Sequence, residues 1–118
     1  MSKPSRSLVN KRSGDVVATR ISTADGMWQN FKGLMFRATL HDGEGLVFRP
    51  ARGIHTHFMR FPIDLLFLDA SDRVTKIRPS MAPWRFDFTN AAGVIEVSSG
   101  FAAAKDIRAG DQLEFRDA

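Results

Sequence analysis

The chain contains no cysteine and only three histidines in 118 residues. The lack of cysteine excludes disulfides, thiolate metal sites and a cysteine nucleophile. A metal could be held only by histidine and carboxylate side chains, and three histidines are few for a complete ligand set. We therefore expect neither a metal nor another cofactor.

Long apolar runs are also absent. No stretch of about 18 apolar residues occurs, so the sequence predicts no transmembrane helix and no membrane partner. The basic, Ser-rich start of the chain is not followed by the apolar segment of a secretory signal, and we expect a cytoplasmic, bacterial protein. Neither a Gly-rich phosphate loop nor a serine hydrolase motif is present, which leaves two common enzyme classes without support.

The composition of the chain is otherwise typical of one small globular domain. Hydrophobic residues make up 43% of the sequence, and ten Phe and two Trp supply large units of buried surface. Residues 1–13 are basic, lack periodicity and contain Pro4, and we predict a flexible basic arm there, followed by a single domain over 14–118. The net charge of +4 permits an anionic partner. Four of the basic residues lie in the arm, so we do not expect nucleic-acid binding.

The apolar pattern predicts a mostly β fold of the α+β class. One helix is predicted over 22–37, where Met27, Trp28, Phe31, Leu34 and Met35 share a face, and a short one over 101–107. Pro79 to Pro83 is expected to break the sheet. Several short strands with one or two short helices favour a small barrel-like or sandwich-like sheet. The predicted strands cover 15–21, 46–48, 52–59, 63–69, 73–78, 93–98 and 112–116.

Three blocks in this order resemble the bacterial and archaeal family known as domain of unknown function 192. The blocks are Gly33-Leu34-Met35-Phe36-Arg37, the stretch from Gly45 to Asp69 with Met59, Pro62 and Asp64, and Val94-Ile95-Glu96-Val97 with Gly100 and Gly110-Asp111. The resemblance implies a compact, mostly β fold with a short helix near the first block, and no established activity. Many members carry an export signal, which this chain lacks. It also has His55-Thr56-His57 where many relatives have an aromatic-rich run.

The segment from His55 to Asp64 is the candidate site. In an extended strand, His55, His57 and Met59 point to one side, and the two imidazoles could share a metal with Asp64 or Glu44. Alternatively, each histidine simply hydrogen-bonds a neighbour. Asp64 precedes a strongly apolar stretch, so it is either a structural carboxylate bound to backbone amides or a base with a shifted pKa.

Arginines near this segment could bind an anion. Arg37 and Arg60 carry fork-shaped donors suited to a carboxylate or phosphate, although such arginines also serve as internal counter-ions. The sequence thus predicts a small-ligand-binding module that holds a polar or anionic molecule in a cleft lined by His55, His57, Met59, Arg60, Asp64 and Arg37. The alternatives are a small hydrolase-like enzyme that uses His and Asp as acid and base, and an interaction domain that uses the basic arm and Arg73 to Arg78.

Overall fold

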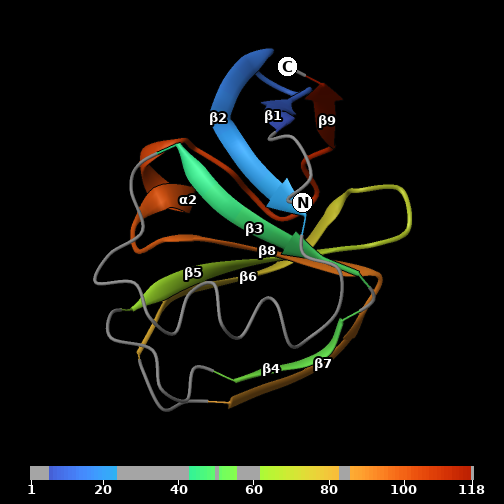
Figure 1. Ribbon diagram of the computed structural model, residues 1–118, viewed down its shortest axis with the longest axis vertical. Coiled ribbons are helices and arrows are strands. Elements are labelled where there is room, and N and C mark those ends of the chain that lie inside the picture. The colour runs from blue at the N-terminus through green and yellow to red at the C-terminus, as the bar shows by residue number, and fades with distance from the viewer. Residues whose placement is uncertain (1–5, 24–42, 50, 56–61, 83–85, 118) are drawn as a thin grey trace.

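The computed structural model describes residues 6–23, 43–49, 51–55, 62–82 and 86–117, and of 48, 51–55 and 86–90 it describes the backbone (Figure 1). One helix is described, α2 (Phe101–Ala104). The strands are β1 (Arg6–Asn10), β2 (Asp15–Thr23), β3 (Glu44–Phe48), β4 (Ala51–His55), β5 (Ile63–Leu68), β6 (Val74–Met81), β7 (Phe86–Ala91), β8 (Gly93–Ser98) and β9 (Leu113–Asp117). The expected mostly β fold is confirmed.

The strands form a curled sheet and a separate ribbon. Seven strands make the sheet in the order β6-β5-β8-β3-β2-β1-β9, and β4 pairs with β7 in the ribbon. All pairs are antiparallel except β2 with β3. The ribbon lies on one side of β5 and β8, and α2 lies on the other (Figure 1). The central strands therefore have structure on both faces.

The burial of β5 follows from this arrangement. All six residues from Ile63 to Leu68 are buried, because alternate side chains enter two separate apolar clusters. Leu66 and Leu68 join the larger cluster, which includes Phe101 of α2. Ile63, Leu65 and Phe67 join the smaller cluster, against which Ala91 of β7 packs. A strand buried on both faces reads as a continuous apolar run, which is why it was predictable.

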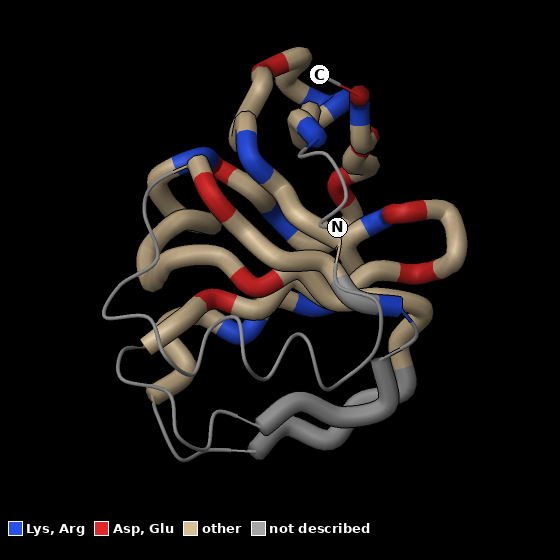
Figure 2. Tube along the Cα trace, in the orientation of Figure 1, with Lys and Arg blue, Asp and Glu red and all other residues tan. Residues whose placement is uncertain are grey.

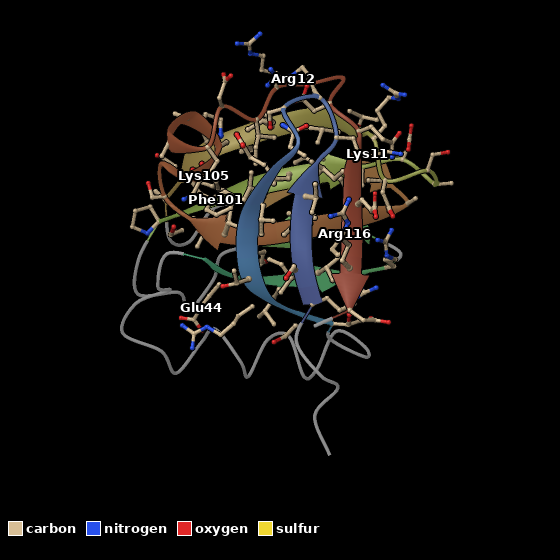
Figure 3. All side chains as sticks on the ribbon, turned by 90° about the horizontal axis from the view of Figure 1, so that it is seen from above. Lys11, Arg12, Glu44, Phe101, Lys105 and Arg116 are labelled. Carbon is tan, nitrogen blue, oxygen red and sulfur yellow. The ribbon has the colours of Figure 1, made fainter. Side chains whose placement is uncertain are left out.

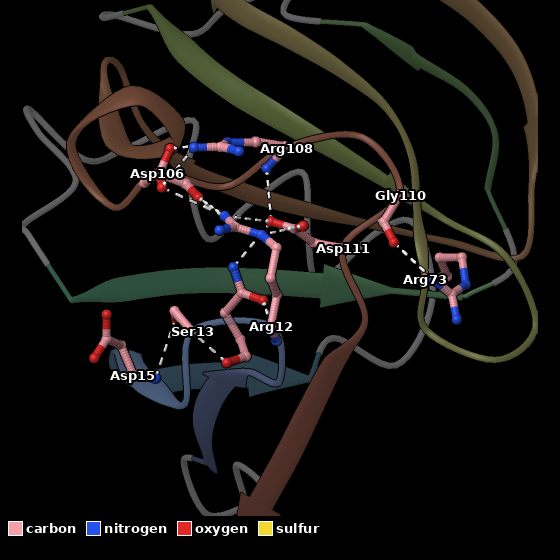
Figure 4. A network of polar contacts seen from close by, with 9 residues as sticks. Arg12, Ser13, Asp15, Arg73, Asp106, Arg108, Gly110 and Asp111 are labelled. Carbon is pink, nitrogen blue, oxygen red and sulfur yellow. Dashed lines mark hydrogen bonds and ion pairs between the residues drawn. The ribbon is translucent and has the colours of Figure 1, made fainter.

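The two edges of the sheet meet beside the start of β6. Arg73 forms an antiparallel bridge with Gln112, which precedes β9. The Val74 amide donates to the Asp111 carbonyl at 2.8 Å, and the Gly110 amide donates to the Val74 carbonyl at 2.7 Å. The Arg73 guanidinium donates to the Gly110 carbonyl at 2.7 Å (Figure 4). These contacts join β6 to the β9 end and turn the sheet into a partly closed barrel.

Arg6–Asn10, within the segment 1–13 that was predicted to be a flexible arm, forms strand β1. β1 lies between β2 and β9 (Figure 3), and Leu8 is fully buried in the larger cluster. The Asn10 side-chain amide donates to Asp111 at 2.9 Å, and the Arg12 guanidinium donates to the same carboxylate at 2.7 Å (Figure 4). The backbone of β1 forms hydrogen bonds with two neighbouring strands. This segment is therefore held in the sheet although it has few apolar residues.

Two other boundaries differ from the predictions. Ser22 and Thr23, expected to begin a helix, end strand β2, and the rest of that predicted helix lies outside the described residues. The sheet is not broken at Pro79, since β6 continues to Met81. β6 is an edge strand of the sheet, and an edge tolerates proline because one side of its backbone needs no ladder partner. No helix among the described residues is long and apolar enough to cross a membrane.

Candidate functional site

Asp64 is a structural carboxylate. It is fully buried and accepts three backbone hydrogen bonds, from Ser80 at 2.7 Å, Gly100 at 3.1 Å and Ala102 at 3.0 Å. The first comes from a bulge in β6, where Ser80 has a positive φ of 47°. The other two come from the residue before α2 and from α2 itself. Asp64 therefore fixes the helix and the β6 bulge to β5, as the structural alternative predicts.

The register of β5 and β8 sets which polar groups share a face. Asp64 pairs with Val97, and Leu65 pairs with Glu96. Because paired residues in an antiparallel ladder project to the same side, Asp64 lies on the face that packs against α2. Glu96 lies on the opposite face, the one towards the β4–β7 ribbon. We call this second surface the Glu96 face; it consists of Ile63, Leu65, Phe67, Met81, Val94 and Glu96.

Glu96 is the unusual residue of this surface. It is only 6% exposed, and its ladder neighbours on either side are Leu46 and Leu65. No hydrogen bond or ion pair between described residues involves its carboxyl group. Burial raises the pKa of Glu96 to about 8, so the side chain holds its proton at neutral pH. A neutral carboxyl group offers one O–H donor together with acceptor lone pairs.

Two basic residues flank the Glu96 face at its β6 edge. Lys76 pairs with Phe67, and its ammonium lies 5.2 Å from the centre of the Phe67 ring. Arg78 pairs with Leu65 and is half-buried. Arg78, Leu65 and Glu96 thus stand in one row across three strands. Strands in a sheet are about 4.8 Å apart, which puts Arg78 about 10 Å from Glu96 at the level of the backbone.

The charged residues as a whole form no extended basic surface on the described part of the chain. Acidic and basic positions are interspersed along the trace (Figure 2). Several basic side chains have internal partners: Arg73 binds the Gly110 carbonyl, Arg12 binds Asp111, and Arg116 binds Glu114 at 2.8 Å. These arginines therefore act as counter-ions and braces within the fold.

The other residues of the predicted site divide into two groups. His55 ends β4 and pairs with Phe86 of β7, so its backbone lies on the ribbon that the Glu96 face looks towards. Its side chain, together with Arg37, His57, Met59 and Arg60, lies outside what the structure describes. Glu44, the alternative carboxylate for a metal, begins β3. In the described ranges, no group of three or more His, Asp or Glu side chains could hold a metal ion.

The sequence reasoning missed Glu96 as a site residue, although a signal was present. Val94-Ile95-Glu96-Val97 is a short apolar strand with one carboxylate in its centre. From the sequence alone, a single carboxylate in an apolar strand is also compatible with a strand that exposes one face to solvent. In the structure β8 lies between β3 and β5 in the sheet, with α2 on one face and the β4–β7 ribbon on the other, and the Glu96 side chain is buried.

Comparisons with known proteins agree with this fold and leave the chemistry open. Residues 8–115 match the sequence profile of DUF192, described as "Uncharacterized ACR". A UPF0127 protein of Thermococcus sibiricus is 31% identical over 92% of this chain and 73% of its own length. One from Pyrococcus furiosus is 29% identical over 92% of this chain and 97% of its own length.

Two crystal structures are similar. A protein of unknown function from Novosphingobium aromaticivorans superimposes with a TM-score of 0.77 at 28% identity, covering 92% of this chain and 83% of that one. A putative transcription regulator from Sinorhizobium meliloti gives a TM-score of 0.80 at 22% identity, covering 93% and 91%. The second likeness shows the fold alone.

Proposed function

This chain belongs to the DUF192 family of uncharacterized proteins, and from that starting point we propose that it is a binding module that holds a small polar molecule against its Glu96 face. The observation that carries the proposal is the buried carboxyl group of Glu96. Moving a carboxyl group out of water costs folding free energy unless hydrogen bonds compensate for the lost hydration. A ligand that hydrogen-bonds Glu96 would remove this cost in the bound state.

The surroundings of Glu96 suit a small organic molecule. Leu65, Phe67 and Val94 are buried apolar neighbours of Glu96 on this face, and ligand sites commonly combine apolar side chains with a few polar groups that fix orientation. The β4–β7 ribbon, which carries His55, lies on this side of the sheet. The proposal keeps the ligand-binding role expected from the sequence and replaces Asp64 by Glu96 as its central carboxyl group.

An NMR fragment screen on the full chain tests the proposal. We expect bound fragments to shift the backbone amide signals of Leu65, Val94 and Glu96, and we expect Glu96→Leu to weaken these fragments at least tenfold. Glu114→Gln is the matched control, because Glu114 lies on β9 and pairs with Arg116. The proposal is wrong if no fragment shifts these signals, or if Glu96→Leu and Glu114→Gln bind the fragments equally well.

A further inference from the structure

We propose that two copies of this chain associate through the outer edge of β9, so that the curled sheet of one copy continues into that of the other. This inference goes beyond the proposed function and does not depend on it. It rests on three features of β9: the free backbone groups of its outer edge, the opposite charges of Glu114 and Arg116, and the strand register that suits both.

β9 is an end strand of the described sheet, and β1 pairs with one of its edges along the whole strand (Figure 3). On the other edge, the Leu113 amide donates to the Asp72 carbonyl at 3.1 Å. Because backbone N–H and C=O groups alternate in direction along a strand, those of Phe115 and Asp117 point to the same edge as the Leu113 amide. No backbone hydrogen bond between described residues uses these groups. Such a row of backbone groups is a template for another strand.

The side chains on the solvent face of β9 carry charges of opposite sign. Leu113 and Phe115 pack in or against the larger apolar cluster, so Glu114 and Arg116 project from the other face of the sheet. The Arg116 and Glu114 side chains are 55% and 39% exposed, and the guanidinium donates to the carboxylate at 2.8 Å. An acidic and a basic residue two positions apart match the same two residues on a strand that runs in the opposite direction. A second copy of this chain supplies such a strand.

One antiparallel register between the two copies satisfies both the backbone and the charges. When each Phe115 stands opposite its counterpart, their outward N–H and C=O groups face each other and exchange two hydrogen bonds. The Asp117 amide of each copy then donates to the Leu113 carbonyl of the other. Glu114 of each copy stands opposite Arg116 of the other, and the four side chains form a ring of alternating charge.

The neighbouring registers are less favourable. A shift of one residue would place the outward backbone groups of one strand opposite groups of the other that point to β1. A shift of two residues in one direction places Arg116 opposite Arg116, and the reverse shift places Glu114 opposite Glu114. Like charges directly opposite each other destabilise a strand pair. The second of these shifts also brings the other copy beside Gln112, where Arg73 already forms a bridge.

The inner face of the pair is compatible with this register. The guanidiniums of Arg6 and Arg49 lie 4.7 Å and 5.2 Å from the centre of the Phe115 ring. Arg49 forms an ion pair with Asp72 at 2.6 Å, and Arg6 stands opposite Asp117 in the ladder. The positive charge beside the two Phe115 rings is therefore partly neutralised, and cross-strand aromatic pairs stabilise a sheet.

Sedimentation equilibrium of the full chain tests the association. The contact is one short strand pair, so we expect a weak dimer whose fraction rises between about 10 µM and about 1 mM protein. Glu114→Arg and Arg116→Glu each place like charges opposite each other, and each should weaken the dimer at least tenfold. An equimolar mixture of these two variants restores opposite charges and should dimerise at least as tightly as the wild type. Arg20→Glu is the control, since Arg20 is exposed on β2 and β1 separates it from β9.

Disulfide formation tests the register, because the chain has no cysteine of its own. In the proposed pairing, the Cα atoms of positions 114 and 116 in opposite copies are about 4.5 Å apart, within the range that a disulfide spans. The two copies of position 114 are diagonal neighbours about 7–8 Å apart, which is too far. We therefore expect Glu114→Cys mixed with Arg116→Cys to form a linked dimer at least tenfold faster than either variant alone.

Three results would overturn the inference. The first is a wild-type chain that stays monomeric at about 1 mM, which would leave the β9 edge to a strand of another protein. The second is a Glu114→Arg dimer as tight as that of the wild type. The third is equal linkage in the cysteine mixture and in either cysteine variant alone; these variants keep one charge pair in each dimer and decide the question if a charge-reversed variant does not fold. None of these results bears on the Glu96 face, which the fragment screen tests separately.

Discussion

Asp64 and Glu96 lie on adjacent strands of the sheet but project to opposite faces, because Asp64 pairs with Val97 while Glu96 pairs with Leu65. Both carboxyl groups are buried. Asp64 accepts hydrogen bonds from three backbone amides, whereas no described residue hydrogen-bonds or ion-pairs with Glu96. A shift of one residue along either strand would move its carboxyl group to the opposite face of the sheet. The strand register therefore places the structural carboxyl group of Asp64 on one face and the candidate ligand-binding group of Glu96 on the other.

Replacing Glu96 should alter the pH dependence of stability. Its folded pKa of about 8 exceeds the ordinary value of 4.5, so the folded state binds the proton more tightly, and wild-type stability falls as pH rises from about 4.5 to about 8. The Glu96→Gln side chain does not ionise, so the variant should not lose stability over this pH range. We expect the variant to be about as stable as the wild type at pH 4 and about 3 kcal/mol more stable at pH 7.

Urea unfolding of both proteins from pH 4 to pH 9 measures this difference. Glu114→Gln serves as the control, since Glu114 is only partly buried beside Arg116 and should show no gain in stability as pH rises. A constant difference between Glu96→Gln and the wild type across this range would contradict the prediction.

Replacing Asp64 should loosen the start of α2. Asp64→Ala removes the carboxyl acceptor of three buried or half-buried amides, and we expect a loss of about 3 kcal/mol in the free energy of unfolding. Hydrogen exchange at the Gly100 and Ala102 amides should accelerate. Ser99→Ala, which removes an exposed hydroxyl bonded to Ser80, should change stability by less than about 0.5 kcal/mol. Equal losses in the two variants would refute the bracing role of Asp64.

Asp111 should stabilise the fold at neutral pH and lose this effect in acid. The hydrogen bond from Arg12, aided by bonds from Arg108 and Asn10, lowers the pKa of Asp111 from 3.8 to about 2. Its contribution is complete above pH about 4 and disappears as pH falls towards 2. We expect Asp111→Asn to be about 2 kcal/mol less stable at pH 7, with a difference that narrows below pH 4.

Acid unfolding of the two proteins from pH 7 to pH 2.5 tests this sign. Asp106→Asn is a matched control because Asp106 also pairs with Arg12 but is largely exposed, so its loss should be smaller. The prediction fails if the Asp111→Asn difference grows in acid.

Buried residues of β1 should contribute as much to the stability of the fold as those of the central strands. Leu8→Ala removes a fully buried side chain and should cost about 3 kcal/mol. Val16→Ala on the adjacent strand is the control, since Val16 pairs with Val9 but is 56% exposed, and should cost less than about 0.5 kcal/mol. Thermal unfolding measures both. Similar midpoints for Leu8→Ala and the wild type would mean that β1 is not part of the cooperative unit.

The sequence predicted the elements whose pattern is local. The apolar strand β5 and the strands β6 and β9 lie close to the predicted ranges 63–69, 73–78 and 112–116. A strand buried on both faces, and a strand with alternating side chains at an edge, each leave a direct pattern in the chain.

The features that the sequence did not predict depend on contacts between distant segments of the chain. β1 contains only Leu8 and Val9 as apolar residues, and it is held by β2 and β9, whose positions beside it no local pattern encodes. Pro79 stays within β6 because that strand is at the edge, which depends on the strand order of the whole sheet. The burial of Glu96 depends on the β4–β7 ribbon, which lies over its face of the sheet and which no local pattern around Glu96 encodes.

The pairing of β1 with β9, in which Arg6 stands opposite Asp117, has a consequence for how the chain folds. Among the described strands, β1 precedes all the others in the chain, and it acquires β9 as a neighbour only after β9 has been synthesised. Closing this pair requires a loop of almost the whole described chain, and such distant contacts slow folding. Until then β1 presents an unpaired edge, which makes the unfinished sheet a template for association between nascent copies.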